Sequence, residues 1–300
     1  MTSSALLLYF EDEAESARRI AAAAGIACMA VSNHQFPDGE FKLRLPDHLP
    51  KRVVILRGLD RPNEKLIELL LAARGARSLG AQHLTLVAPY LAYMRQDMAF
   101  APGEVISQHI VGQYLASLFD ALVTVDPHLH RVATLEQAVP VSQAITLSGA
   151  PLLADLIARL RPGALLVGPD EESAQWIAQA AARHGFDQAV CRKVRRGDKQ
   201  VDIELPKQDF SGRAIVLMDD VASSGHTLAM ASRLLLAAGA ASVDVAVTHA
   251  LFAHDALDVI QRSGIQQVWS TDCIQHSSNA ISMAPTIAHA LCSLDPGSLP

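Results

Sequence analysis

Short apolar runs alternate with longer amphipathic segments along the whole chain. The runs are rich in β-branched residues, as strands are, and the segments between them repeat apolar residues at helical spacing. We expect strands at 5–10, 52–58, 83–90, 121–126, 164–170, 214–220 and 243–250. We expect helices near 12–24, 63–79, 105–118, 150–161, 172–184, 227–238 and 254–263. Since nearly continuous apolar strands need cover on both faces, the pattern predicts an α/β fold of mostly parallel sheets flanked by helices.

The length of the chain and a lapse in this pattern predict two domains. The chain has 300 residues, which is enough for two hydrophobic cores. Strong periodicity weakens in the stretch VPVSQAITLSGAP, residues 139–151. We therefore expect domains at 1–145 and 146–300, with the same architecture but no exact internal repeat.

Composition narrows the classes of partner and the compartment. The formal net charge is −6 with no basic block, so nucleic acid is not expected as a main partner. The N-terminus lacks a basic region, and no segment holds about 18 uninterrupted apolar residues, so we expect no signal peptide and no membrane span. The cysteines are scattered, which predicts free thiols in a reducing cytoplasm rather than a zinc site or disulfides. They are Cys28, Cys191, Cys273 and Cys292.

Polar residues cluster where four of the expected strands end. In open α/β sheets ligands bind beyond the carboxyl ends of the strands, so these segments are expected to form the edges of a shared site. The segments are PYLAYMRQD at 89–97, VDPHLHR at 125–131, GPDEES at 168–173 and MDDVASSGHT at 218–227.

The segment MDDVASSGHT combines two acids with a small-residue loop that leads into a helix. Unsatisfied N–H groups at a helix N-terminus bind phosphate, and carboxylates accept hydrogen bonds from sugar hydroxyls or bind magnesium. A phosphorylated sugar meets both demands. The alternative is a polar strand end followed by an ordinary Ser/Thr helix cap. The residues concerned are Asp219, Asp220, Ser223, Ser224, Gly225, His226 and Thr227.

Two further segments are predicted to be hairpins. CRKVRRGDKQVDIEL, residues 191–205, carries Lys193 and Arg195 and could stabilise a polyphosphate, or it is a solvated turn. FPDGEFKLRL, residues 36–45, joins Pro-Asp-Gly turn chemistry to alternating residues.

Single polar residues at two strand ends also leave alternatives open. His128 and His130 alternate along an extended segment, so at most one of them faces a given site. Asp170 either serves that site or caps the following helix.

Taken together, these segments resemble the ribose-phosphate diphosphokinase (phosphoribosyl pyrophosphate synthetase) family. The similar segments, in the family's order, are FPDGE, residues 61–97, VDPH, GPD, the Lys193-x-Arg195 pair and MDDVASSGHT. The resemblance implies two tandem type I phosphoribosyltransferase-like domains. It also implies that the C1 hydroxyl of ribose 5-phosphate attacks the β-phosphorus of ATP, so that diphosphate is transferred and AMP leaves.

The resemblance implies roles for individual residues and a Mg²⁺ cofactor. ATP would contact Phe36, Asp38, Glu40, Arg95 and Gln96, the hairpin acting across the interface of a homo-oligomer. Ribose 5-phosphate would be bound by Asp219, Asp220, Ser223, Ser224, Gly225, His226 and Thr227. Lys193, Arg195 and His128 would be catalytic, and His128 and Asp170 would lie at the metal.

The chain departs from the family pattern at three positions that matter for the chemistry. Glu171 and Glu172 follow Asp170 where the family is glycine-rich, and His226 replaces a small residue. Two alternatives therefore stay open: a non-catalytic or regulatory paralogue, and a phosphoribosyltransferase that consumes phosphoribosyl diphosphate.

Overall fold

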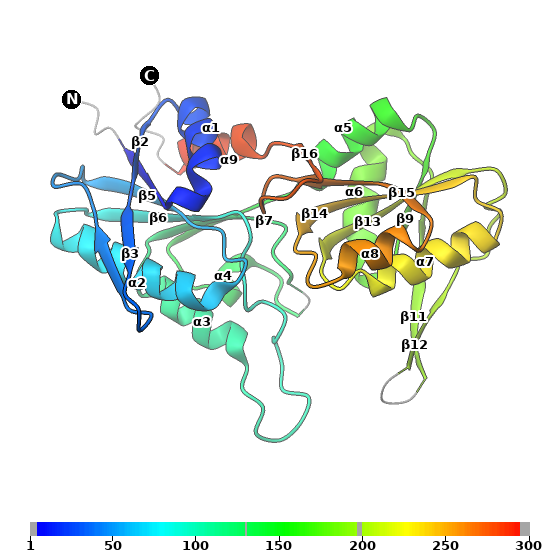
Figure 1. The fold of residues 1–300 in the computed structure, drawn as a ribbon, viewed down its shortest axis with the longest axis horizontal. Helices are drawn as coiled ribbons and strands as arrows, with labels where there is room; N and C mark the ends of the chain where they lie inside the picture. The colour runs from blue at the N-terminus through cyan, green and yellow to red at the C-terminus, as the bar shows by residue number, and fades with distance from the viewer. Residues whose placement is uncertain (1–4, 130, 197–199, 295–300) are drawn as a thin grey trace. The chain divides into compact units, whose positions relative to one another are not determined.

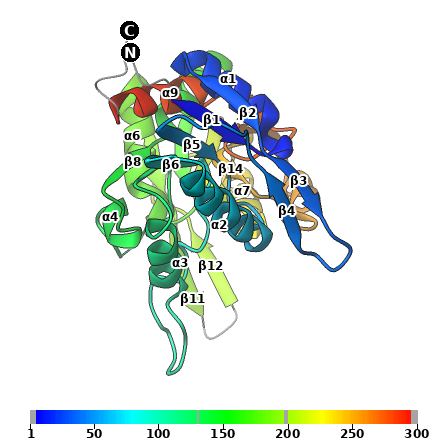
Figure 2. The same cartoon turned by 90° about the vertical axis from the view of Figure 1, so that its left-hand side faces the viewer.

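The computed structural model describes residues 5–129, 131–196 and 200–294, with the side chains of residues 195, 196, 200 and 201 outside this description. The chain divides into two compact units, one of which is Ser148–Ser282. The other unit comprises the residues up to Leu147 and the segment that starts at Met283. The expected second domain ran to residue 300, but helix α9 (Ala284–Ser293) packs against α1 (Ala14–Ala24) of the first unit (Figures 1 and 2).

The first unit is built on a six-stranded parallel sheet with the order β2-β1-β5-β6-β7-β8. Helices α1 and α9 cover one face, and α2 and α3 cover the other (Figure 2). The strands are β1 (Leu6–Tyr9), β2 (Ala27–Ala30), β5 (Arg52–Leu56), β6 (His83–Ala88), β7 (Ala121–Val125) and β8 (Gln143–Leu147). The remaining helices are η1 (Glu11–Glu13), α2 (Pro62–Ser78), α3 (Ser107–Ala116) and α4 (Leu135–Ala138).

The second unit repeats this architecture with the sheet order β10-β9-β13-β14-β15-β16. One apolar cluster packs α5 and α6 on one face of the sheet, and another packs α7 and α8 on the opposite face. The strands are β9 (Leu165–Gly168), β10 (Gln188–Val190), β13 (Ala214–Ala222), β14 (Ser242–Ala250), β15 (Ile265–Thr271) and β16 (Asn279–Ile281). The helices are α5 (Ala150–Leu160), η2 (Glu171–Ser173), α6 (Ala174–His184), α7 (His226–Ala237) and α8 (Ala256–Gln261).

Each unit also carries an antiparallel hairpin that is separate from its main sheet (Figure 1). In the first unit β3 (Ser32–Gln35) pairs with β4 (Phe41–Arg44), and in the second β11 (Arg192–Arg196) pairs with β12 (Gln200–Glu204). Both hairpins were predicted, and so was the α/β class with two parallel sheets flanked by helices, which the structure confirms. Within the described parts of the chain, none of the helices has both the length and the apolar character needed to cross a bilayer.

Gly112 of α3 lies directly against the backbone at the end of α4. A Cβ atom built on Gly112 would lie 1.8 Å from the carbonyl oxygen of Ala138, at the end of α4. A backbone carbonyl cannot move aside as the end of a side chain can. Glycine is therefore required here for packing, although its place inside a helix costs backbone entropy.

Replacing Gly112 by alanine should destabilise the protein by about 1–3 kcal/mol or more, because the core must separate to admit one methyl group. Gly75→Ala in α2 is the matched control, since its Cβ would meet only the flexible Leu45 Cδ1, at 3.1 Å. Alanine is the better helix former by about 1 kcal/mol, so Gly75→Ala should be neutral or stabilising. Urea unfolding measures both variants, and equal stabilities would contradict the packing role of Gly112.

Candidate active site

Two acidic strand ends meet at the point where the strand order of the second sheet reverses. From β9 the chain continues to β10 on one side, and from β13 it continues to β14 on the other, while β9 and β13 pair directly. Asp170 lies just beyond the end of β9, and Asp219 and Asp220 lie within β13. This is the place at which open α/β sheets bind their ligands.

Asp170 uses its two carboxylate oxygens for different partners. Oδ1 accepts a hydrogen bond from the backbone N–H of Glu172 at 3.1 Å, and Oδ2 lies 3.6 Å from Lys193 Nζ. The residue therefore caps the short helix η2, as one of the two predicted alternatives states, and it also forms an ion pair with Lys193. Asp170 is buried, whereas Glu171 and Glu172 are exposed.

Negative charge is concentrated around Asp219. Burial, helped by the charges of Asp220 and Asp170, raises the pKa of Asp219 well above its usual range. The backbone N–H of Asp220 donates to Asp219 Oδ1 at 3.0 Å. The geometry thus places two adjacent acids and a third nearby, with strong acceptor oxygens suited to hydroxyl donors or to a hard cation.

The loop after β13 ends in a helix whose N-cap residue has no side chain. Gly225 takes this position with φ 74°, and α7 begins at His226. A Cβ on Gly225 would lie 3.0 Å from the Ala256 carbonyl oxygen, so both backbone angle and packing require glycine. The first N–H groups of a helix have no intrahelical partner. The alternative of a Ser/Thr cap on Ser223 or Ser224 is therefore not what the structure shows.

The rest of this loop is held by backbone contacts and leaves polar side chains accessible. The N–H of Ala253 donates to the Ser223 carbonyl at 2.9 Å, next to the end of β14. Ser224 and His226 are exposed, and Thr227 is half-buried. The predicted loop residues thus surround the N-terminus of α7, at the same edge of the sheet as the acids of β13.

The cationic segment forms the predicted antiparallel hairpin. Lys193 pairs in register with Ile203 and Arg195 with Val201. Lys193 reaches Asp170 through the ion pair, so the hairpin is joined to the end of β9. The side chain of Arg195 lies outside the described residues.

In the first unit the predicted residues Arg95, Gln96 and His128 follow two neighbouring strands, β6 and β7. Arg95 is exposed, and Gln96 Nε2 donates to the Met98 carbonyl at 3.0 Å. His128 is half-buried. The other predicted histidine of this segment, His130, lies outside the described residues.

The loops after β6 and β7 are joined by an ion pair that was not predicted. Arg131 Nη1 lies 2.6 Å from Asp97 Oδ1, and the Asp97 side chain is only 1% exposed. Both residues fall in segments already singled out. Opposite charges after adjacent strands were the available signal, but strand adjacency cannot be read from spacing along the chain.

The hairpin of the first unit presents the remaining predicted side chains on an exposed turn. The N–H of Phe36 donates to the Glu40 carbonyl at 2.8 Å, and the Glu40 N–H donates to Asp38 Oδ1 at 3.2 Å. Phe36 is 40% exposed, and its ring meets the His34 ring edge-on, with the two ring centres 4.9 Å apart. The turn therefore presents a partly exposed aromatic ring beside the polar side chains of Asp38 and Glu40.

No preformed metal cage is found in the described chain. Within residues 5–129, 131–196 and 200–294, no group of three or more His, Cys, Asp or Glu side chains is placed to hold a metal ion. The two predicted ligands, His128 and Asp170, belong to different units.

Comparison with protein families matches both units. Residues 5–118 match the N-terminal domain of ribose phosphate pyrophosphokinase, and residues 149–273 match the phosphoribosyl transferase domain. The phosphoribosylpyrophosphate synthetase of Mycobacterium smegmatis has the same fold over 97% of this chain and 98% of its own, with a TM-score of 0.85 at 23% identity.

Curated relatives are similar over nearly their full length. The ribose-phosphate pyrophosphokinase of Methanopyrus kandleri is 33% identical over 278 residues, which is 91% of this chain and 94% of that protein. The enzyme of the same name from Halobacterium salinarum is 31% identical over 291 residues, or 95% of this chain and 100% of that protein. Since both units match domains of this family and relatives above 30% identity are covered over nearly their whole length, the chain belongs to the ribose-phosphate pyrophosphokinase family.

Proposed function

We propose that the protein transfers diphosphate from ATP to the C1 hydroxyl of ribose 5-phosphate, giving phosphoribosyl diphosphate and AMP. The observation that carries the proposal is the junction of β9 and β13, where an acid pair lies beside an open helix N-terminus. A sugar phosphate has hydroxyls for the acids and an anion for the helix. Family membership supplies the reaction.

The sugar site is formed by the end of β13 and the start of α7. Asp219 and Asp220 accept hydrogen bonds from the ribose hydroxyls, while the loop binds the 5-phosphate through backbone N–H groups and hydroxyls. The exposed His226, at the first position of α7, adds a second kind of donor. The loop residues are Ser223, Ser224, Gly225, His226 and Thr227.

The nucleotide site is assigned to the first unit. Arg95 and Gln96, after β6, contact ATP together with Phe36, Asp38 and Glu40 of the hairpin turn. The exposed Phe36 ring supports stacking on a base, and the turn serves a neighbouring subunit of a homo-oligomer. The oligomer is part of the proposal because the exposed turn would complete the nucleotide site of another copy.

The described residues fit a Mg²⁺ cofactor. Asp170 and the acids of β13 supply the oxygen ligands that Mg²⁺ prefers. Burial, helped by the charges of Asp220 and Asp170, raises the pKa of Asp219, and a bound cation would favour its ionised form. Mg²⁺ is usually held by one or two carboxylates plus substrate phosphates, so it needs no group of three or more protein ligands. His128 and Asp170 are the proposed protein ligands, and the ion offsets phosphate charge when bound.

The cationic residues act on the transferred group. As the C1 oxygen bonds to the β-phosphorus and the bond to the AMP oxygen breaks, negative charge spreads over the phosphoryl oxygens. Lys193 and Arg195 of β11 stabilise that charge, and His128 lies close to the nucleotide phosphates. The ion pair with Asp170 keeps Lys193 at the end of β9 before substrates bind.

Purified protein should release AMP from ATP only when ribose 5-phosphate and Mg²⁺ are both present, because the sugar hydroxyl is the nucleophile. Coupled detection of AMP measures this, with omission of each component as the control. A phosphoribosyltransferase would instead consume phosphoribosyl diphosphate with a base. ATP binding by calorimetry without sugar-dependent AMP would identify a non-catalytic paralogue and overturn the proposal.

Lys193→Ala and Arg195→Ala should each lower kcat by about 10²–10³, the usual cost of removing one preorganised charge donor. Arg192→Ala is the matched control, since Arg192 lies on the same strand but pairs with Glu204 at 2.5 Å and is exposed. The control should retain kcat within a few-fold of the parent. Equal losses in all three variants would show that the hairpin acts only as a scaffold.

A further inference from the structure

The β3–β4 hairpin needs an anchor outside itself. It forms a sheet of only two strands, and all four residues of β3 are exposed. An isolated two-stranded hairpin is marginally stable in water. Its turn carries Phe36, Asp38 and Glu40, so the orientation of the hairpin decides where these side chains point.

One face of the hairpin lies against helix α2. In the register of the two strands Asn33 is opposite Leu43, so the two side chains share a face. Leu43 and Leu45 pack at the margin of the apolar core of the first unit, and Leu45 Cδ1 approaches Gly75 of α2. These apolar contacts hold β4 against the body of the first unit, and β3 is held by a polar contact.

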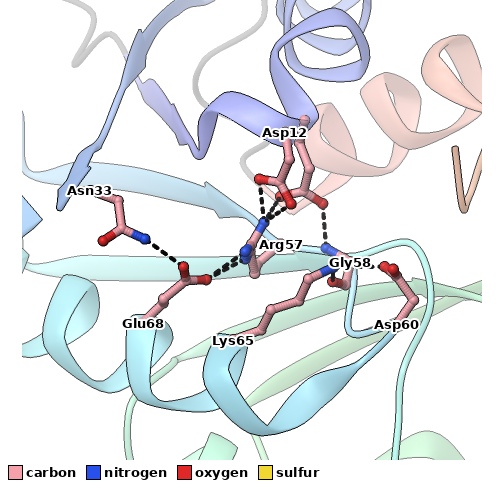
Figure 3. A network of polar contacts seen from close by, with 8 residues as sticks. Asp12, Asn33, Arg57, Gly58, Asp60, Lys65 and Glu68 are labelled. Atoms are coloured by element: carbon pink, nitrogen blue, oxygen red, sulfur yellow. Dashed lines mark hydrogen bonds and ion pairs between the residues drawn. The ribbon is translucent and has the colours of Figure 1, made fainter. Parts of the chain in front are cut away.

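That polar contact joins Asn33 to a buried carboxylate. Asn33 Nδ2 donates to Glu68 Oε1 at 2.6 Å, and Glu68 is only 4% exposed within α2 (Figure 3). Burial raises the pKa of Glu68 above its usual value in spite of the neighbouring Arg57. A carboxylate so placed requires a donor at each oxygen.

The second oxygen of Glu68 is held by Arg57, at the end of β5. Arg57 Nε donates to Glu68 Oε2 at 2.8 Å, and its Nη1 donates to both oxygens of Asp12, at 2.7 and 2.8 Å (Figure 3). The guanidinium also lies 4.5 Å from the centre of the Phe10 ring and is 4% exposed. Arg57 is thus fixed on several sides, and it fixes Glu68 in turn.

We propose that Arg57, Glu68 and Asn33 form a positioning relay that orients the nucleotide-binding hairpin from the end of β5. The inference deepens the proposed function, because it rests on the turn at residues 36–40 as an ATP contact. None of the three is a catalytic residue. Arg57 orients Glu68, Glu68 holds Asn33, and Asn33 sets the angle at which β3 leaves the body of the first unit.

The decisive variant is Asn33→Asp, which puts a carboxylate against Glu68 Oε1 and replaces attraction by repulsion. It should raise KM for ATP by about tenfold, as expected for losing a hydrogen bond to a charged group. KM for ribose 5-phosphate and kcat should change much less. Ser32→Ala, on the same exposed strand, is the control and should leave KM for ATP unchanged.

A second substitution separates positioning from general damage. In Asn33→Asp combined with Glu68→Gln, the new amide offers its oxygen to Arg57 and its N–H to the new aspartate, so the bond returns with its polarity reversed. KM for ATP in the double variant should return to within a few-fold of the parent. Recovery is not expected if Asn33 acts through anything other than its bond to Glu68.

Hydrogen exchange of the backbone amides in 32–44 gives a readout that does not need turnover. Exchange should rise in Asn33→Asp and fall again in the double variant. If the parent makes no sugar-dependent AMP but exchange follows this pattern, the proposed function fails and the relay stands. If the parent is active while both exchange and KM for ATP in Asn33→Asp equal the parent values, the relay is wrong.

Discussion

Buried or nearly buried carboxylates next to cations recur where strands of both sheets end, and the arrangement of the loops depends on them. Glu68 is held by Arg57, Asp97 by Arg131 and Asp170 by Lys193. Leaving one of these buried charges unpaired would destabilise the folded protein by roughly several kcal/mol. Each pair is therefore expected to form as the chain folds. Each pair joins segments that are separate in sequence. Because each buried carboxylate needs a cation beside it, these ion pairs fix the positions of the loops that carry them.

The fold was predictable where local pattern and burial agree. Most interior strands of both sheets are buried apolar runs, and they were expected from the sequence. β15 was not expected, because this interior strand has two exposed glutamines and only partial burial. β8 was missed because it is a partly exposed edge strand with burial that does not alternate cleanly. α9 was missed, and its partner could not have been found from sequence alone. An apolar face shows that a helix is covered, but not that α1 covers it.

The sequence predicted which strand ends form the site, but it predicted the positions of the side chains there only in part. Asp170 and the acids of β13 lie at one sheet edge because parallel strands place their carboxyl ends together. A Ser or Thr side chain could have capped α7, but Gly225 is the N-cap residue because its backbone has a positive φ. The order of residues in the sequence does not determine that angle. The contact of Asn33 with Glu68 spans 35 residues, and no short-range pattern signals it.

The first sheet also has a point where the strand order reverses, between β1 and β5. Asp12 follows β1, Arg57 follows β5, and the two are joined by hydrogen bonds of 2.7 and 2.8 Å. At the equivalent point of the second sheet lie the acids of β13 and the N-terminus of α7, which form the proposed sugar site. At the reversal in the first sheet, the Arg57 guanidinium instead bonds to Asp12 and Glu68 of the same unit. The repeated fold therefore carries the proposed sugar site at only one of its two strand-order reversals, so the proposed function predicts one bound sugar for each chain.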